Sequence, residues 1–169
     1  MAQQVQSSLK RAQMYRLAAV KATSIVQATV SDRLTEQAWR RTLDSAWDAG
    51  CRSAWTEGGR SNSDKTLQGF IDHPCTKDAW EGLCERGYVI GIRPLSSKPY
   101  GGKRTIEAKA YAQAAADALL DGTVSQGTNE SVDKFIKTLE KRFVHWKNAN
   151  NLIDVVWSMS GAHLLQSPR

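Results

Sequence analysis

The segment from Trp39 to Trp55 constrains the fold more than any other part of this sequence. Trp39, Leu43, Trp47, Cys51 and Trp55 recur at every fourth position. This spacing is typical of one side of an α-helix and excludes a β-strand, in which faces alternate at every second residue. Half of the six tryptophans lie in this segment. Because large aromatic side chains dominate core energetics, we predict that this helix is the central element of the fold.

The aromatic side of this helix changes along its length. A step of four residues drifts by about 40° in a helix with 3.6 residues per turn. Trp39, Leu43 and Trp47 stay near one face and are predicted to be core residues. Trp55 drifts toward a ladder of charged residues that also recur every fourth position, namely Glu36, Arg40, Asp44, Asp48 and Arg52. We expect Trp55 to be partly exposed, and we assign it as a candidate partner-binding residue.

The whole sequence predicts a mostly α protein, a compact multi-helix bundle of six or seven helices in a single domain of residues 1–169. The central helix begins after a cap at Ser31 or Thr35 and ends near Glu57. Further helical patterns cover residues 3–30, 64–72, 76–86, 105–120, about 129–146 and about 150–165. Pro74 separates the two short helices, and Thr76 is the expected cap of the second. The last helix is almost wholly apolar, so we expect it to be buried.

One short β-hairpin near residues 88–108 is the predicted exception to the helical pattern. Residues 88–95 have the β-branched and apolar composition of a strand, and a polar loop with two glycines follows at 96–102. Residues 103–109 could be the partner strand or the start of the next helix. The sequence leaves both possibilities open.

The charge of the chain favours a polyanionic partner. The net charge is +6 and the isoelectric point is about 9.4. The positive charge is concentrated in residues 1–30, 91–112 and 134–169, each with a net charge of +4. Such basic segments are typical of proteins that bind nucleic acid, although a basic protein need not do so.

The cysteines indicate a reducing, cytoplasmic environment. The chain has three cysteines, Cys51, Cys75 and Cys84. An odd number leaves one cysteine unpaired, which argues against a disulfide framework. Together with His73 they are four residues of the types that bind zinc, but their spacing matches no standard zinc motif, and we favour buried thiols. We therefore predict no metal and no cofactor.

No segment approaches the roughly 20 apolar residues of a membrane span, so we expect no membrane association.

The sequence contains no recognisable catalytic motif. It lacks a Walker loop, a GxSxG elbow, an HExxH helix and a dinucleotide-binding fingerprint. Cys75 lies two residues from His73 without an obvious third group. Asp44 and Asp48 share a helix face but have arginines beside them. We therefore predict a non-enzymatic protein with no catalytic residues.

A row of basic residues on the helix near 129–146 is the best candidate nucleic-acid site. Positions i, i+3 and i+7 share one side of a helix and can follow a phosphate backbone. The candidate residues are Lys134, Lys137, Lys141 and His145 with Arg142 on the flank, and Lys98, Tyr100, Lys103 and Arg104 in or beside the loop at 96–102. Lysines favour phosphate contacts over base readout. The alternative interpretation is a solvated helix face and a solubilising loop.

The sequence-based hypothesis is a basic helical subunit that binds RNA or DNA mainly through phosphates and packs against other protein subunits in a nucleoprotein assembly. A first alternative is an adaptor or inhibitor that binds proteins and has no intrinsic affinity for nucleic acid. A second is a DNA-binding regulator, because residues 64–109 resemble a winged helix in outline. Asp78, Glu81 and Glu85 would then face the phosphates, which argues against DNA reading.

Overall fold

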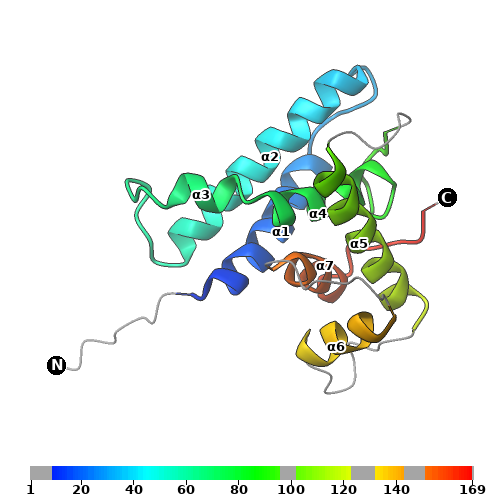
Figure 1. The fold of residues 1–169 in the computed structure, drawn as a ribbon. Coiled ribbons are helices and arrows are strands. Elements are labelled where there is room, and N and C mark those ends of the chain that lie inside the picture. The colour runs from blue at the N-terminus through cyan, green and yellow to red at the C-terminus, as the bar shows by residue number, and fades with distance from the viewer. Residues whose placement is uncertain (1–8, 96–101, 123–131, 143–150, 169) are drawn as a thin grey trace.

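The structure, a computed structural model, describes residues 9–95, 102–122, 132–142 and 151–168. These residues form seven α-helices and no β-strand, so the predicted mostly α fold is confirmed (Figure 1). The helices are α1 (Arg11–Gln27), α2 (Glu36–Glu57), α3 (Leu67–Ile71), α4 (Pro74–Glu85), α5 (Lys103–Leu120), α6 (Val132–Arg142) and α7 (Leu152–Gly161).

The contact between α1 and α2 forms the largest part of the core. A Cβ atom added to Gly50 on α2 would lie 2.7 Å from the carbonyl oxygen of Ala18 and 2.9 Å from the amide nitrogen of Ala22 on α1. Glycine and alanine at the crossing therefore allow the two backbones to approach closely. Thr35 immediately precedes α2, and its Oγ1 accepts a hydrogen bond from the Ala38 amide at 3.1 Å. The expected cap of α2 at this position is therefore confirmed.

The tryptophans of α2 lie in the core, as predicted for the first two. Trp39 and Trp47 are 1% and 0% exposed, and Leu43 between them is 2% exposed. Each indole N–H has a carbonyl partner: Trp39 Nε1 donates to Arg93 O at 2.8 Å, and Trp47 Nε1 donates to Ile71 O at 3.1 Å. These bonds connect α2 to the segments on either side of α4 while satisfying the polar atom of each ring.

The expected exposure of Trp55 is wrong. Trp55 is 2% exposed, and its Nε1 donates to Ser61 O at 2.9 Å. The chain after α2 turns back over the ring, so that Arg60 lies 4.8 Å from the ring centroid and Phe70 on α3 lies 5.2 Å from it. The Trp55 ring is thus covered although the charged residues beside it, such as Arg52 and Glu57, are exposed, and the basis for a partner-binding role of Trp55 is removed.

The predicted β-hairpin near residues 88–108 is also wrong. Residues 103–109 are the first two turns of α5, whose alanine-rich sequence favours a helix. Residues 88–90 instead contact residues 164–166: Ile90 N donates to Leu164 O at 2.9 Å, and Gln166 N donates to Tyr88 O at 2.8 Å, before the chain turns at residues 90–91. This contact is an isolated bridge between Val89 and Leu165. Without a hairpin, the winged-helix outline is lost.

The apolar helix α7 is buried, as predicted, and it contacts α1, α4, α5 and α6. Its single carboxylate, Asp154, accepts hydrogen bonds from Arg16 on α1 at 2.8 and 2.6 Å.

The start of α4 differs from the predicted cap at Thr76. Pro74 is the first residue of this helix rather than a separator, and Thr76 lies inside the helix, where its Oγ1 donates to His73 O.

Candidate functional site

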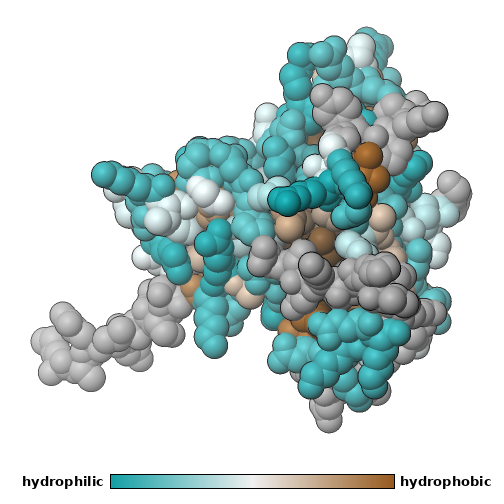
Figure 2. All heavy atoms as spheres, viewed as in Figure 1, coloured by the Kyte–Doolittle hydropathy of each residue, from teal (hydrophilic) through white to brown (hydrophobic). Residues whose placement is uncertain are grey.

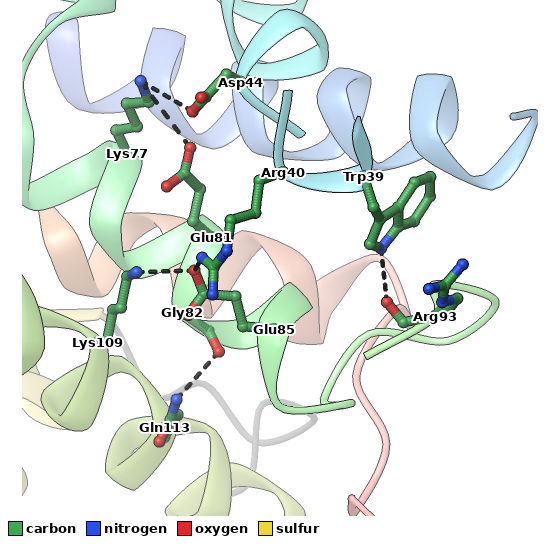
Figure 3. Close-up of polar contacts among 10 residues, drawn as sticks. All are labelled: Trp39, Arg40, Asp44, Lys77, Glu81, Gly82, Glu85, Arg93, Lys109 and Gln113. Carbon is green, nitrogen blue, oxygen red and sulfur yellow. Dashed lines mark hydrogen bonds and ion pairs between the residues drawn. The ribbon is translucent and has the colours of Figure 1, made fainter. Parts of the chain in front are cut away.

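A cleft of about 780 Å³ lies between α2, α4 and α5. Figure 3 shows charged residues of the cleft from all three helices: Arg40 and Asp44 from α2, Lys77, Glu81 and Glu85 from α4, and Lys109 from α5. Helical spacing explains this arrangement, because Lys77, Glu81 and Glu85 are separated by four residues and share one side of α4. The other sides of α4 carry Ala79, Trp80, Leu83 and Cys84, which are buried.

Glu85 is held by two bases in the wall of the cleft. Its Oε1 lies 2.9 Å from Arg40 Nη1 and 2.8 Å from Lys109 Nζ. The side chains of Glu85 and Lys109 are 7% and 4% exposed. Gly82 fixes this geometry, because an added Cβ at this position would lie 2.7 Å from Lys109 Cβ, and Gln113 Nε2 donates to Gly82 O at 3.0 Å. Buried charges persist when they are paired in this way.

Asp44, Lys77 and Glu81 form a second charged group in the same cleft. Lys77 Nζ lies 3.1 Å from Asp44 Oδ1 and 3.9 Å from Glu81 Oε1. Glu81 Oε1 is buried and has no hydrogen-bond partner among the described residues. Burial, followed by the hydrogen bond to Asp44 and its negative charge, raises the pKa of Glu81 to about 9. Glu81 is therefore a neutral acid at neutral pH.

The pKa of Asp44 moves in the opposite direction from that of Glu81. Burial raises the pKa of Asp44, but the hydrogen bonds from Glu81 and Lys77 outweigh burial and the net shift is downward. The two carboxyl groups thus differ in protonation: Asp44 is ionised and Glu81 keeps its proton. Carboxyl pairs whose pKa values are pushed apart in a cleft are typical of binding and acid–base sites, and they also occur in structural ion-pair networks.

This cleft is not evident from the sequence alone. Within the sequence, Asp44 stands out only as one half of a balanced pair with Asp48 on α2, and Glu81 only as an acid unfavourable for DNA contact. The spacing of Lys77, Glu81 and Glu85 shows that they share a face, which is a usable signal. Their proximity to Asp44 depends on how α4 packs beside α2, which the local sequence does not specify.

The predicted lysine row lies on the exposed side of α6. Lys134, Lys137 and Lys141 are exposed. Phe135 and Leu139 on the other side are fully buried, and the Phe135 ring lies 5.2 Å from that of Trp157 on α7. Figure 2 shows the hydrophilic surface that α6 presents. The predicted binding residues Lys98, Tyr100 and His145 lie outside the described residues, as does the side chain of Arg142.

The remaining predicted binding residues are separate from this row. Lys103 and Arg104 are exposed in the first turn of α5. With 18 residues, α5 is about 27 Å long. Figure 1 shows α6 beyond the opposite end of α5. The structure therefore does not combine Lys103 and Arg104 with the α6 lysines into one patch.

The candidate zinc ligands do not converge. Cys51 and Cys84 are buried and Cys75 is half-buried, and all three are free thiols. Burial is the main cause that raises the pKa of each thiol. Within the described ranges, no group of three or more histidine, cysteine, aspartate or glutamate side chains has the arrangement of a metal site. His73 lies against the Tyr15 ring, with a centroid distance of 5.7 Å, and burial lowers its pKa.

A protein-family model described as a family of unknown function (DUF6979) matches residues 12–166. The chain belongs to this family. Searches of curated proteins and of solved structures gave no match. In the described part of this DUF6979 chain, none of the helices combines the length and the apolar character that crossing a membrane requires.

Proposed function

We propose that this DUF6979 protein is a non-enzymatic subunit that binds RNA or DNA through phosphate groups, within a larger cytoplasmic nucleoprotein assembly. The observation that carries this proposal is the two-sided character of α6. Its buried side is fixed by Phe135 and Leu139, while Lys134, Lys137 and Lys141 project from the exposed side. A packed helix holds these charges in a row rather than leaving them on a free chain.

The dimensions of this lysine row fit a phosphate backbone. Lys134 and Lys141 are seven residues apart, which corresponds to about 10 Å along the helix axis. This length covers a few phosphates of one strand. Each neutralised phosphate releases condensed counterions, so the logarithm of the binding constant falls with the logarithm of the salt concentration, with a slope of about −0.9 per contact on duplex DNA and about −0.7 on single strands.

The test is a salt-dependent binding measurement with two matched triple variants. Lys134→Glu, Lys137→Glu and Lys141→Glu reverse the α6 row. Lys10→Glu, Arg33→Glu and Lys65→Glu change the net charge equally at exposed positions elsewhere. We expect the α6 variant to make the salt slope shallower by about 2 to 3 and the control variant to change it less. Equal effects of the two variants would contradict a site on α6.

The adaptor hypothesis gives a different result in the same experiment. An adaptor has no intrinsic affinity for nucleic acid at moderate salt and forms a stable complex with a protein. Absorbance at 260 and 280 nm in the purified protein, and size-exclusion chromatography with and without nuclease, distinguish the two. A complex that survives nuclease, from a protein that binds neither RNA nor DNA, would replace the present proposal.

A further inference from the structure

The cleft between α2, α4 and α5 contains an acceptor atom that no described residue uses. Glu81 Oε1 is buried, and Lys77 Nζ at 3.9 Å is beyond hydrogen-bond distance. Asp44 acts on the other side of this carboxyl group, because its interaction with Glu81 raises the pKa of Glu81 and lowers the pKa of Asp44. Oε1 therefore requires a donor. A buried polar atom without a partner costs free energy, and ligand sites are places where such a cost is recovered on binding.

The charge of the cleft favours a positively charged donor. Six carboxyl groups and four basic groups line it. Three of the bases already contact carboxylates: Arg40 and Lys109 contact Glu85, and Lys77 contacts Asp44. The carboxyl groups of the cleft thus outnumber its basic groups. Leu43 and Pro74 add apolar surface to the lining, which fits the aliphatic part of a small ligand.

We propose that this cleft binds a small organic cation whose ammonium or guanidinium group donates to Glu81 Oε1 on the side of the cleft that opens at Asp44. The site is open to solvent at Asp44, whose side chain is 53% exposed, and it narrows toward Glu81, whose side chain is 15% exposed. A ligand can therefore enter past Asp44. An organic cation fits better than a metal ion, because the described residues provide no group of three metal-binding side chains.

Binding of the cation is coupled to release of a proton. In the empty cleft, Asp44 and Lys77 cancel each other and Glu81 is neutral. When a cation is bound, ionised Glu81 balances the new charge, so the local sum returns to zero. The other ionisable groups around Glu81 come from all three helices and are Arg40 on α2, Asp78, Cys84 and Glu85 on α4, and Lys109 on α5.

The first test is calorimetric titration of the full chain with agmatine, which carries an ammonium and a guanidinium group on a short aliphatic chain. 1,4-Butanediol and succinate are the neutral and anionic controls. We expect agmatine to bind and the controls not to bind. Glu81→Gln and Asp44→Asn should each weaken agmatine binding at least about tenfold, which is about 1.4 kcal/mol. Glu57→Gln, on the same helix as Asp44 but outside the cleft, should leave it unchanged.

The second test measures protons and does not depend on the variants folding well. Titrations at a pH of about 7, in two buffers of different ionisation enthalpy, give the number of protons released. We expect close to one proton per agmatine from the unaltered protein, since the pKa of Glu81 is about 9. The proposal is overturned if agmatine does not bind at roughly 1 mM, if the diol binds equally well, or if no proton is released. It is independent of nucleic-acid binding, so either proposal can fail without the other.

Discussion

The α1–α2 contact and the α4–α5 contact both depend on a glycine, but they bury different chemistry. At Gly50 the facing atoms are the backbone of Ala18 and Ala22, and the surroundings are apolar. At Gly82 the facing atoms belong to Lys109, whose ammonium group reaches a buried carboxylate. Close approach of the helices thus allows apolar packing at Gly50, whereas at Gly82 it positions the Lys109 ammonium group against a carboxylate. The two contacts should respond differently to mutation, pH and salt.

The largest expected effect is at the charged contact. Glu85→Gln removes the carboxylate that both Arg40 and Lys109 contact, and it takes away the charge that the buried Lys109 ammonium group contacts at 2.8 Å. We expect the free energy of unfolding to fall by about 3–5 kcal/mol, as measured by urea denaturation. Lys109→Met should cost less, because Glu85 keeps Arg40 as a partner. A loss below about 1 kcal/mol for Glu85→Gln would show that the contacts of Glu85 with Arg40 and Lys109 contribute little to the free energy of unfolding.

The next effect separates the apolar contact from the charged one. Gly50→Ala places a methyl group against backbone atoms that have no freedom to move aside. We expect a loss of about 1–3 kcal/mol that does not change with salt. Gly69→Ala in α3 is the control, because nothing lies within 4 Å of the added Cβ. Equal stability of the two variants would show that α1 and α2 do not cross as closely as described.

The pH dependence of stability should come from the cleft. Between about pH 4.5 and about 9, the unfolded chain loses the Glu81 proton while the folded protein retains it. The stability that Glu81 contributes is therefore complete below about pH 4.5 and declines as the pH rises to about 9. The slope is at most about 1.4 kcal/mol per pH unit. Urea denaturation across this range should show the decline, and Glu81→Gln should remove it. A slope unchanged in the variant would assign the effect to another group.

The smallest effect is at the rim of the α1–α2 contact. Lys21 Nζ lies 2.7 Å from Glu57 Oε2, and the Glu57 side chain is 55% exposed. We expect Glu57→Gln to change the free energy of unfolding by less than about 1 kcal/mol, and by less still at high salt. A thermal melt is sufficient to check this. A larger change would show that the edges of this contact are more important than its apolar interior.

The helices could be predicted from the sequence because their signals are local. Thr35 caps α2 as expected, and α6 and α7 lie within the segments that their periodic apolar residues predict. Residues 129–131 and 143–146 of the first of these segments lie outside the described residues. The strand prediction at 88–95 fails for a physical reason. A turn at residues 90–91, with Gly91 at a φ of 75°, interrupts the segment. Its hydrogen-bond partners lie at residues 164–166, and no local pattern identifies a partner so far along the chain.

The candidate cleft could be predicted only in part. The shared face of Lys77, Glu81 and Glu85 follows from their spacing, whereas the contact of this face with Asp44 and Lys109 is a property of tertiary packing. The prediction for Trp55 failed in a similar way. The helical drift is a property of α2 alone, and it does not include the loop after α2 that returns to cover the ring.

The contact between α1 and α7 has a consequence for how the protein folds. Thr23 Oγ1 lies 3.3 Å from Met159 Sδ, and Arg16 is paired with Asp154, 138 residues further along the chain. A helical protein with such distant partners must close a long loop before these contacts form, and folding rates fall as the sequence separation of contacts grows. During synthesis, the side of α1 that α7 covers stays exposed to water until residues 152–161 emerge from the ribosome. Until then, this side of α1 is accessible to chaperones.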